Sequence, residues 1–166
     1  IKSPTPRSCA GVNAGRAAND LGPLEGIPYD GVVSLNGARC VANDGRVVSL
    51  HPIPRAEFDR AWALSEELDF AMGLELEEGV FVNRVTPDVK RVAHMVAHPV
   101  PEQTDLRELF GRVECCQLCF YFDAETQRRV MAELPTLVAS RWCPIFADVN
   151  VAGIDKATGM EEFMSS

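Results

Sequence analysis

The chain has 166 residues, 46% of them hydrophobic and 24% charged, and its 16 basic and 24 acidic side chains give a formal charge of −8 at pH 7. This composition is that of a globular protein and excludes a disordered or fibrous chain, while the length predicts one domain, or one and a fraction. The acidic balance argues against binding to nucleic acid or to an anionic membrane surface, because both need a positive field.

The first thirty residues are rich in proline and glycine, which predicts loops with one short element at most. The apolar run at 31–36 then indicates a buried strand that ends in an Asn-Gly turn. Two strand-like runs, 39–42 and 46–50, flank Asn43-Asp44-Gly45 and predict a hairpin.

From residue 54 onward, helices alternate with hairpins. Pro54 opens a helix with apolar side chains at helical spacing, and Thr86-Pro87-Asp88 supplies a cap, a first-turn proline and an acid for the next helix. The other predicted elements are a hairpin of strands 74–76 and 80–82, a helix 104–110, a strand 115–122, a helix 123–134, strands 137–142 and 146–151, and a last helix capped by Asp155. This order predicts an α+β open-faced sandwich, in which a largely antiparallel sheet carries helices on one face.

The cysteines and histidines suggest metal sites only weakly. Cys115-Cys116-x-x-Cys119 lies in a predicted strand, where Cys116 and Cys119 face opposite ways, and no second pair follows, so we interpret these thiols as small buried hydrophobic groups. His94 and His98 share a helix face but lack an HExxH pattern, which favours surface histidines. No apolar stretch approaches the about 18 residues that span a membrane. The start of the chain lacks a signal peptide's apolar segment, so reduced thiols and a cytoplasmic location are expected.

Three further positions are candidates for ligand contacts. Arg16 follows a short glycine-bearing loop, which by itself is weak evidence for phosphate binding. Asn36-Gly37 at a strand end is first of all a turn, and only secondarily a ligand contact. Lys156 at the start of the last helix is first of all a solvated cation, although its opposition to the helix dipole adds weight to a functional role.

Three segments together resemble the Cof-type, sugar-phosphatase-like branch of the haloacid dehalogenase (HAD) superfamily. They are DGVVSLNGA at 30–38, RWCPIFADV at 141–149 and GIDKATGM at 153–160, and they stand in the order and at the spacing found in that family. The resemblance covers about residues 22–163. It implies a remnant of a Rossmann-like core at 1–38, an α/β cap of the type called IIB at 39–150, and the start of a C-terminal core segment at 151–166.

The resemblance also implies a reaction. Members of the family hydrolyse phosphate monoesters through an aspartyl-phosphate, with Mg²⁺ and a Lys neutralising the phosphoryl oxygens. Lys156 matches that Lys, Asn36 and Gly37 match the substrate-contacting core–cap junction, Arg16 matches the Arg of a TGR-like motif, and Arg141 is a further substrate-binding candidate. The implied partner is a small phosphorylated metabolite such as a sugar phosphate.

The departures from the family pattern restrict these expectations. The chain contains no D-x-D-G-T and no G-D-x-x-N-D, Ala14 replaces a phosphate-contacting hydroxyl, and residues 3–8 cannot form the expected central strand. We therefore predict a truncated phosphatase, mainly its cap, that is inactive alone and binds no Mg²⁺ tightly. The alternative is a non-catalytic ligand-binding or self-associating module. It would form a homo-oligomer through an exposed sheet, since loss of the core would uncover Val32, Val33 and Leu35.

Overall fold

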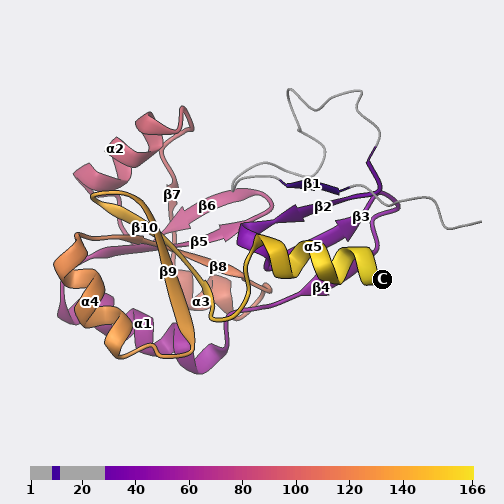
Figure 1. Cartoon of the computed structure of the whole chain (residues 1–166). Helices are drawn as coiled ribbons and strands as arrows, with labels where there is room; N and C mark the ends of the chain where they lie inside the picture. The colour runs from indigo at the N-terminus through magenta and orange to yellow at the C-terminus, as the bar shows by residue number, and fades with distance from the viewer. Residues whose placement is uncertain (1–8, 12–28) are drawn as a thin grey trace, which may run out of the picture. The chain divides into compact units, whose positions relative to one another are not determined.

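A computed structural model describes residues 9–11 and 29–166, and the chain divides into two compact units (Figure 1). The first unit comprises Ile1–His51 and Gly153–Ser166, and the second comprises Pro52–Ala152. The division falls at Pro52 and not at residue 39, because the strand that begins at Arg39 pairs with its neighbour in the first unit.

The first unit contains a four-stranded sheet in the order β1-β2-β3-β4, with the helix α5 packed on it. The β1–β2 pair is parallel, and the β2–β3 and β3–β4 pairs are antiparallel. In Figure 1 the helix α5 runs alongside β2, β3 and β4. The elements are β1 (Cys9–Gly11), β2 (Gly31–Ser34), the short 3-10 helix η2 (Leu35–Gly37), β3 (Arg39–Ala42), β4 (Val47–Leu50) and α5 (Lys156–Ser165).

The core of the first unit joins β2 and β3 to α5. Val33, Cys40 and Phe163 form a buried cluster, with exposed fractions of 2%, 0% and 2%. Val32 is also buried at 6%, and Leu35 is half-buried. The expectation that β2 exposes an apolar surface is therefore wrong. The helix α5 packs against this strand, and its Phe163 covers Val33. The formation of a homo-oligomer stays a prediction, but an exposed apolar face of β2 no longer supports it.

The second unit contains a six-stranded sheet in the order β7-β6-β5-β8-β10-β9. All its strand pairs are antiparallel except β6–β7, which is parallel. Its strands are β5 (Ala71–Leu76), β6 (Gly79–Val82), β7 (Glu102–Gln103), β8 (Gln117–Tyr121), β9 (Leu137–Cys143) and β10 (Phe146–Val151). Its helices are α1 (Arg55–Glu67), α2 (Pro87–Met95), α3 (Leu106–Phe110) and α4 (Ala124–Ala132).

The two faces of this sheet carry different helices, because side chains alternate along each strand. Leu118 and Phe120 of β8 join the larger core, to which α1, α3 and α4 contribute. Cys119 and Tyr121 belong to a smaller cluster with Val89 and other residues of α2. The predicted α+β sandwich is thus confirmed. The helices α1, α3 and α4 cover one face of the sheet, as expected, whereas α2 packs on residues of the opposite face. No helix among the described residues is both long and apolar enough to cross a membrane.

The predicted helix starts are confirmed by their caps. Thr86, Asp123 and Asp155 each accept a hydrogen bond from a backbone N–H of the first turn of α2, α4 and α5. Such a bond satisfies one of the N–H groups that a helix leaves unpaired at its start. The two-residue strand β7 was not predicted, because two residues are too few to show an alternation of apolar and polar side chains.

Candidate functional site

Three consecutive residues between β2 and β3 have a left-handed backbone. The φ angles of Leu35, Asn36 and Gly37 are 51°, 56° and 98°. This conformation suits Gly and is tolerated by Asn, but in Leu it costs about 1–2 kcal/mol. Such strain persists only where the surrounding structure holds it, and it is frequent at functional sites.

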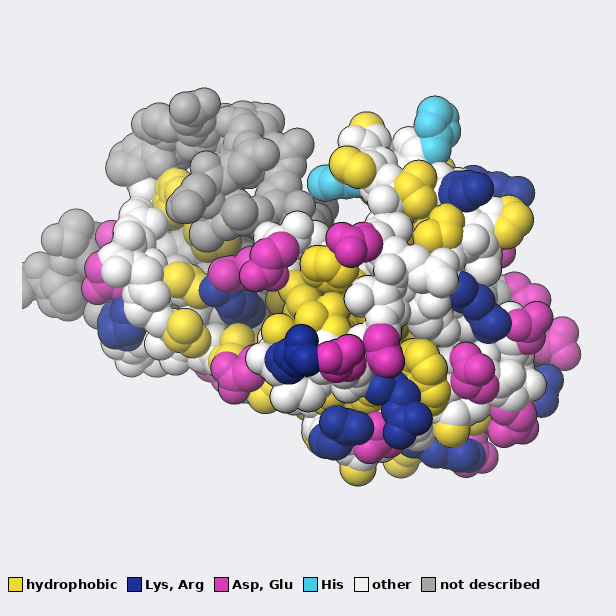
Figure 2. Space-filling model, turned by 180° about the vertical axis from the view of Figure 1, so that it is seen from behind, with side chains coloured by type: hydrophobic (Ala, Val, Ile, Leu, Met, Phe, Trp, Pro, Cys, Tyr) yellow, Lys and Arg dark blue, Asp and Glu magenta, His cyan; other side chains and the backbone are white. Residues whose placement is uncertain are grey.

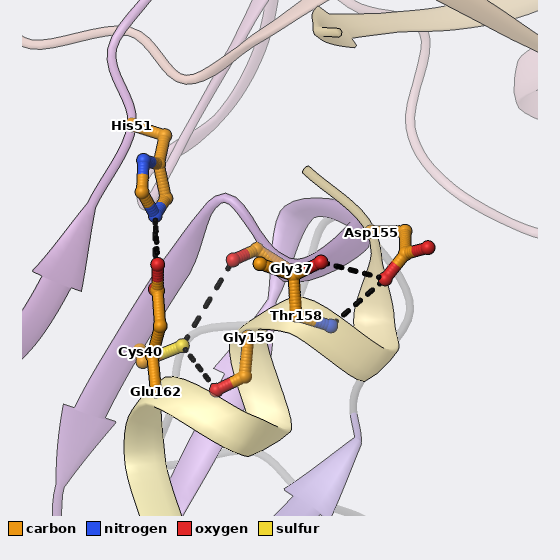
Figure 3. A network of polar contacts seen from close by, with 7 residues as sticks. All are labelled: Gly37, Cys40, His51, Asp155, Thr158, Gly159 and Glu162. Atoms are coloured by element: carbon orange, nitrogen blue, oxygen red, sulfur yellow. Dashed lines mark hydrogen bonds and ion pairs between the residues drawn. The ribbon is translucent and has the colours of Figure 1, made fainter. Parts of the chain in front are cut away.

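The start of α5 holds this turn in place (Figure 3). A Cβ atom on Gly37 would lie 1.9 Å from the backbone oxygen of Asp155 and 3.0 Å from the backbone nitrogen of Lys156. The two backbones are therefore in direct contact, and only Gly fits at position 37. Of the sequence-predicted site residues, Asn36, Gly37 and Lys156 are brought together here.

Asp155 fixes the first turn of α5. Its Oδ1 accepts hydrogen bonds from the backbone N–H of Thr158 at 2.8 Å and from the Thr158 hydroxyl at 3.1 Å. These bonds to the ionised form lower the pKa of the Asp155 carboxyl. Lys156 follows directly and its side chain is exposed, so the helix places a cation where a negatively charged ligand has access.

A polar contact joins a later turn of the same helix to the residue that follows β4. Nε2 of His51 lies 2.9 Å from Oε2 of Glu162, and this contact lowers the pKa of the Glu162 carboxyl. The sequence offered no signal for this pair, because its members are 111 residues apart. A lone His before a proline and a Glu in a helix are individually ordinary.

Two other predicted residues lie elsewhere. Arg16, like Ala14 and residues 3–8, is outside the described residues. Arg141 belongs to β9 in the second unit, where its Nη1 donates hydrogen bonds to the backbone oxygens of Phe122, Cys143 and Pro144 at 3.1, 3.1 and 2.8 Å. Its Nε donates to Gln127 at 2.7 Å. These contacts give Arg141 a structural role, and its contact with substrate stays a prediction.

The second unit contains a buried polar cluster that the sequence did not predict. Glu75 of β5 is only 3% exposed and accepts a hydrogen bond from Nε2 of Gln117, which also donates to Asp148 of β10 at 3.0 Å. Burial, reinforced by the negative charge of Asp148, raises the pKa of Glu75 to about 8. A protonated Glu75 is therefore the expected state at neutral pH.

Glu75, Cys119 and Asp148 place their ligand atoms within 4.8 Å of one another, the arrangement among the described residues that comes nearest to a metal site. The set does not fit Mg²⁺, which prefers six oxygen ligands. Burial raises the pKa of the Cys119 thiol well above its usual value, and Glu75, with a pKa raised to about 8, is expected to be protonated at neutral pH. No step of a reaction is therefore assigned to Mg²⁺ at this cluster.

The remaining cysteines and histidines agree with the structural interpretation. Cys115, Cys116 and Cys119 are buried thiols, and burial raises the pKa of Cys115 to about 12. His94 and His98 are exposed, as predicted. Figure 2 shows basic and acidic side chains interspersed over the described residues of that face, without the basic patch that a polyanion would need.

The comparison with known families decides the identity of the fold. Residues 13–166 match the sequence model of the haloacid dehalogenase-like hydrolases. The chain belongs to this family. The resemblance carried by the segments at 30–38, 141–149 and 153–160 is thus confirmed, and the family is one of phosphatases.

Solved structures agree with this assignment. BT1666 from Bacteroides thetaiotaomicron, one of the phosphatases of the HAD superfamily, is 54% identical to this chain with a TM-score of 0.85; the match covers 93% of this chain and 58% of that protein. The HAD subclass IIB sugar phosphatase BT4131 is 25% identical with a TM-score of 0.78, over 93% of this chain and 61% of that protein. TM0651 from Thermotoga maritima, at 13% identity and a TM-score of 0.71, matches in fold; that match covers 93% of this chain and 61% of TM0651.

This HAD chain therefore spans about three fifths of the length of the structures it matches. No curated protein sequence matches it.

Proposed function

We propose that the chain forms the substrate-selecting cap and an adjoining part of the core of a Cof-type phosphatase. The second unit, 52–152, is the cap in this proposal, and the first unit belongs to the core. The whole protein would hydrolyse a small phosphate monoester, with Mg²⁺, through an aspartyl-phosphate. The likeness to BT1666 supports phosphatase chemistry, and the likeness to the sugar phosphatase BT4131 supports a sugar phosphate as the substrate class.

The observation that carries the proposal is the contact between the Asn36–Gly37 turn and the start of α5 at Lys156. In this proposal the Lys156 ammonium neutralises charge on the phosphoryl oxygens, which is worth most when the cation is already in place before the reaction. The amide of Asn36 orients the substrate beside it, and Arg16 supplies a further cation. The described acidic cluster does not fit Mg²⁺, so the metal of the family would need other ligands.

The proposal also limits the activity of the chain when it is alone. None of the Asp residues in the 166-residue sequence is followed by a second Asp two positions later, so the pair that acts as nucleophile and acid–base catalyst in the family is absent from this stretch. We propose that the chain by itself binds a phosphorylated ligand without hydrolysing it. A cytoplasmic location also stays a prediction.

Assayed alone, the chain is expected not to release nitrophenol from p-nitrophenyl phosphate above the buffer rate, with or without Mg²⁺. The physical reason is that the electrostatic stabilisation by Lys156 has no nucleophile to assist. The measurement is a spectrophotometric assay with the Lys156→Ala variant as control. A Mg²⁺-dependent turnover that Lys156→Ala abolishes would contradict the proposed limit.

Inorganic phosphate is expected to bind weakly at the Asn36–Lys156 junction. In ¹H–¹⁵N NMR spectra of the chain, the backbone amide signals of Asn36 and Lys156 should move as phosphate is added, and Lys156→Ala should abolish the response because the cation is lost. Lys90→Ala, which removes an exposed cation from α2 in the other unit, is the matched control and should leave the titration unchanged. Equal responses in both variants would refute a phosphate contact at Lys156.

A further inference from the structure

A glycine inside α5 is a local choice that helix propensity opposes. Gly159 lies near the start of the ten-residue helix and is buried. Glycine in a helix interior is less favourable than alanine by about 0.5–1 kcal/mol. Its presence therefore calls for a reason in the packing.

The reason is a close approach of two backbones. A Cβ atom on Gly159 would lie 2.8 Å from the backbone oxygen of Gly37 and 2.9 Å from the Gly37 Cα. It would also lie 2.9 Å from Cγ1 of Val33. Two of these three atoms belong to backbone, which cannot turn aside as the end of a flexible side chain can.

A buried thiol fixes the same contact from the neighbouring strand (Figure 3). The Cys40 side chain is fully buried, and its Sγ donates to the backbone oxygen of Gly159 at 3.3 Å, with the Gly37 oxygen 3.9 Å away. A helix carbonyl has a second lone pair free for such a bond. Cys40 therefore ties β3 to α5 within one turn of Lys156.

We propose that Gly159 and Cys40 are positioning residues, which set the place of Lys156 relative to Asn36 through the contact of α5 with the Gly37 turn. Gly159 allows the two backbones to approach, and Cys40 fixes both the position of α5 along its axis and its rotation about that axis. The catalytic meaning of this arrangement rests on the proposed function, because it assumes that Lys156 meets a phosphoryl group. The geometric claim does not depend on that function.

The Gly159→Ala variant tests the claim, with Gly111→Ala as the matched control. Gly111 follows α3 in the second unit, where the nearest atom to an added Cβ is 3.4 Å away, so alanine fits. One Gly37 Hα occupies the direction of the absent Cβ and so lies close to the Lys156 amide, which predicts a nuclear Overhauser contact between the two. We expect this contact in the wild type and in Gly111→Ala, and its loss in Gly159→Ala while the contacts within α5 persist.

The second readout is the phosphate titration of the Lys156 amide. Gly159→Ala is expected to weaken phosphate binding in this titration about tenfold or more, which is the effect of losing one charged contact. A folded Gly159→Ala chain that keeps both the Overhauser contact and the wild-type phosphate response would overturn the proposal. If the wild type itself shows no phosphate response, the proposed function fails, while the Overhauser contact still decides the positioning.

Cys40 variants decide the matter if Gly159→Ala does not fold. Cys40→Ala adds no atoms, and we expect it to reduce the Gly37–Lys156 Overhauser contact and to weaken the phosphate response about threefold. Cys40→Ser keeps a donor at the same place and should restore both. If the Overhauser contact is the same in all three chains, Cys40 does not position Lys156, and with an unfolded Gly159→Ala the role of both residues reduces to stability alone.

Discussion

The Glu75→Gln variant is expected to remove most of the loss of stability that the second unit suffers as pH rises from about 4.5 to about 8. In the wild type the buried carboxyl has its pKa raised from 4.5 to about 8, so between these values the folded state keeps a proton that the unfolded state has released. The folded state then binds more protons, and the free energy of unfolding falls as pH rises. The contribution of Glu75 is fully present below about pH 4.5 and is lost through about pH 8.

Above pH 8, the free energy of unfolding has lost on the order of 4 kcal/mol of the contribution of Glu75. A glutamine resembles the protonated acid, because it is neutral and offers an acceptor oxygen and a donor NH2 group beside Gln117 and Asp148 without a proton to lose. The measurement is urea unfolding at pH 5, 7 and 9, followed by tryptophan fluorescence, since Trp62 and Trp142 both lie in the second unit. Glu78→Gln, at an exposed position next to β5, should follow the wild type. Parallel pH profiles for Glu75→Gln and the wild type would show that Glu75 is ionised in the folded protein.

The Gly37→Ala variant is expected to destabilise the first unit by at least about 3–4 kcal/mol. Two effects add: alanine is strained at a φ of +98°, and its Cβ would lie 1.9 Å from the Asp155 backbone oxygen. Because the tryptophans report on the other unit, amide hydrogen exchange in β3 and α5 is the suitable measurement.

Gly45→Ala separates the two effects. Gly45 has a φ of +84° with nothing within 4 Å of an added Cβ, so alanine there suffers the left-handed strain alone, about 1–2 kcal/mol. The difference between the two variants measures the contact with α5. If the amides of β3 and α5 are equally protected from exchange in Gly37→Ala and Gly45→Ala, the turn and the helix are not in the close contact described above.

Much of the fold could be predicted from local pattern. The Asn43-Asp44-Gly45 turn sets a hairpin through its own backbone preferences, and Asp123 and Asp155 start helices through bonds to residues three positions on. Such signals need no knowledge of the rest of the chain. The predicted hairpin and both helix starts are therefore confirmed almost to the residue.

The contacts that give the sites their character could not be predicted in this way. Glu75 looks like the polar residue of an alternating strand, and only its place between Gln117 and Asp148 makes it a buried acid. Gly159 looks like a helix-weakening residue until the Gly37 turn is seen against it. The expected exposure of Val33 failed for the same reason, since its packing against Phe163 of α5 is not visible in either segment alone.

The first unit draws its sheet and its helix from segments on either side of the second unit, and this has a consequence for how the chain folds. Cys40 meets Gly159 across 119 residues of sequence, so closing this core involves a long loop and a correspondingly high contact order. During synthesis, β2, β3 and β4 emerge well before α5, and the apolar side chains that α5 covers stay exposed until then. The second unit, by contrast, is continuous from Pro52 to Ala152 and has all its strands and helices available before the first unit can be completed. By folding early, it would shorten the effective loop that separates the two halves of its neighbour.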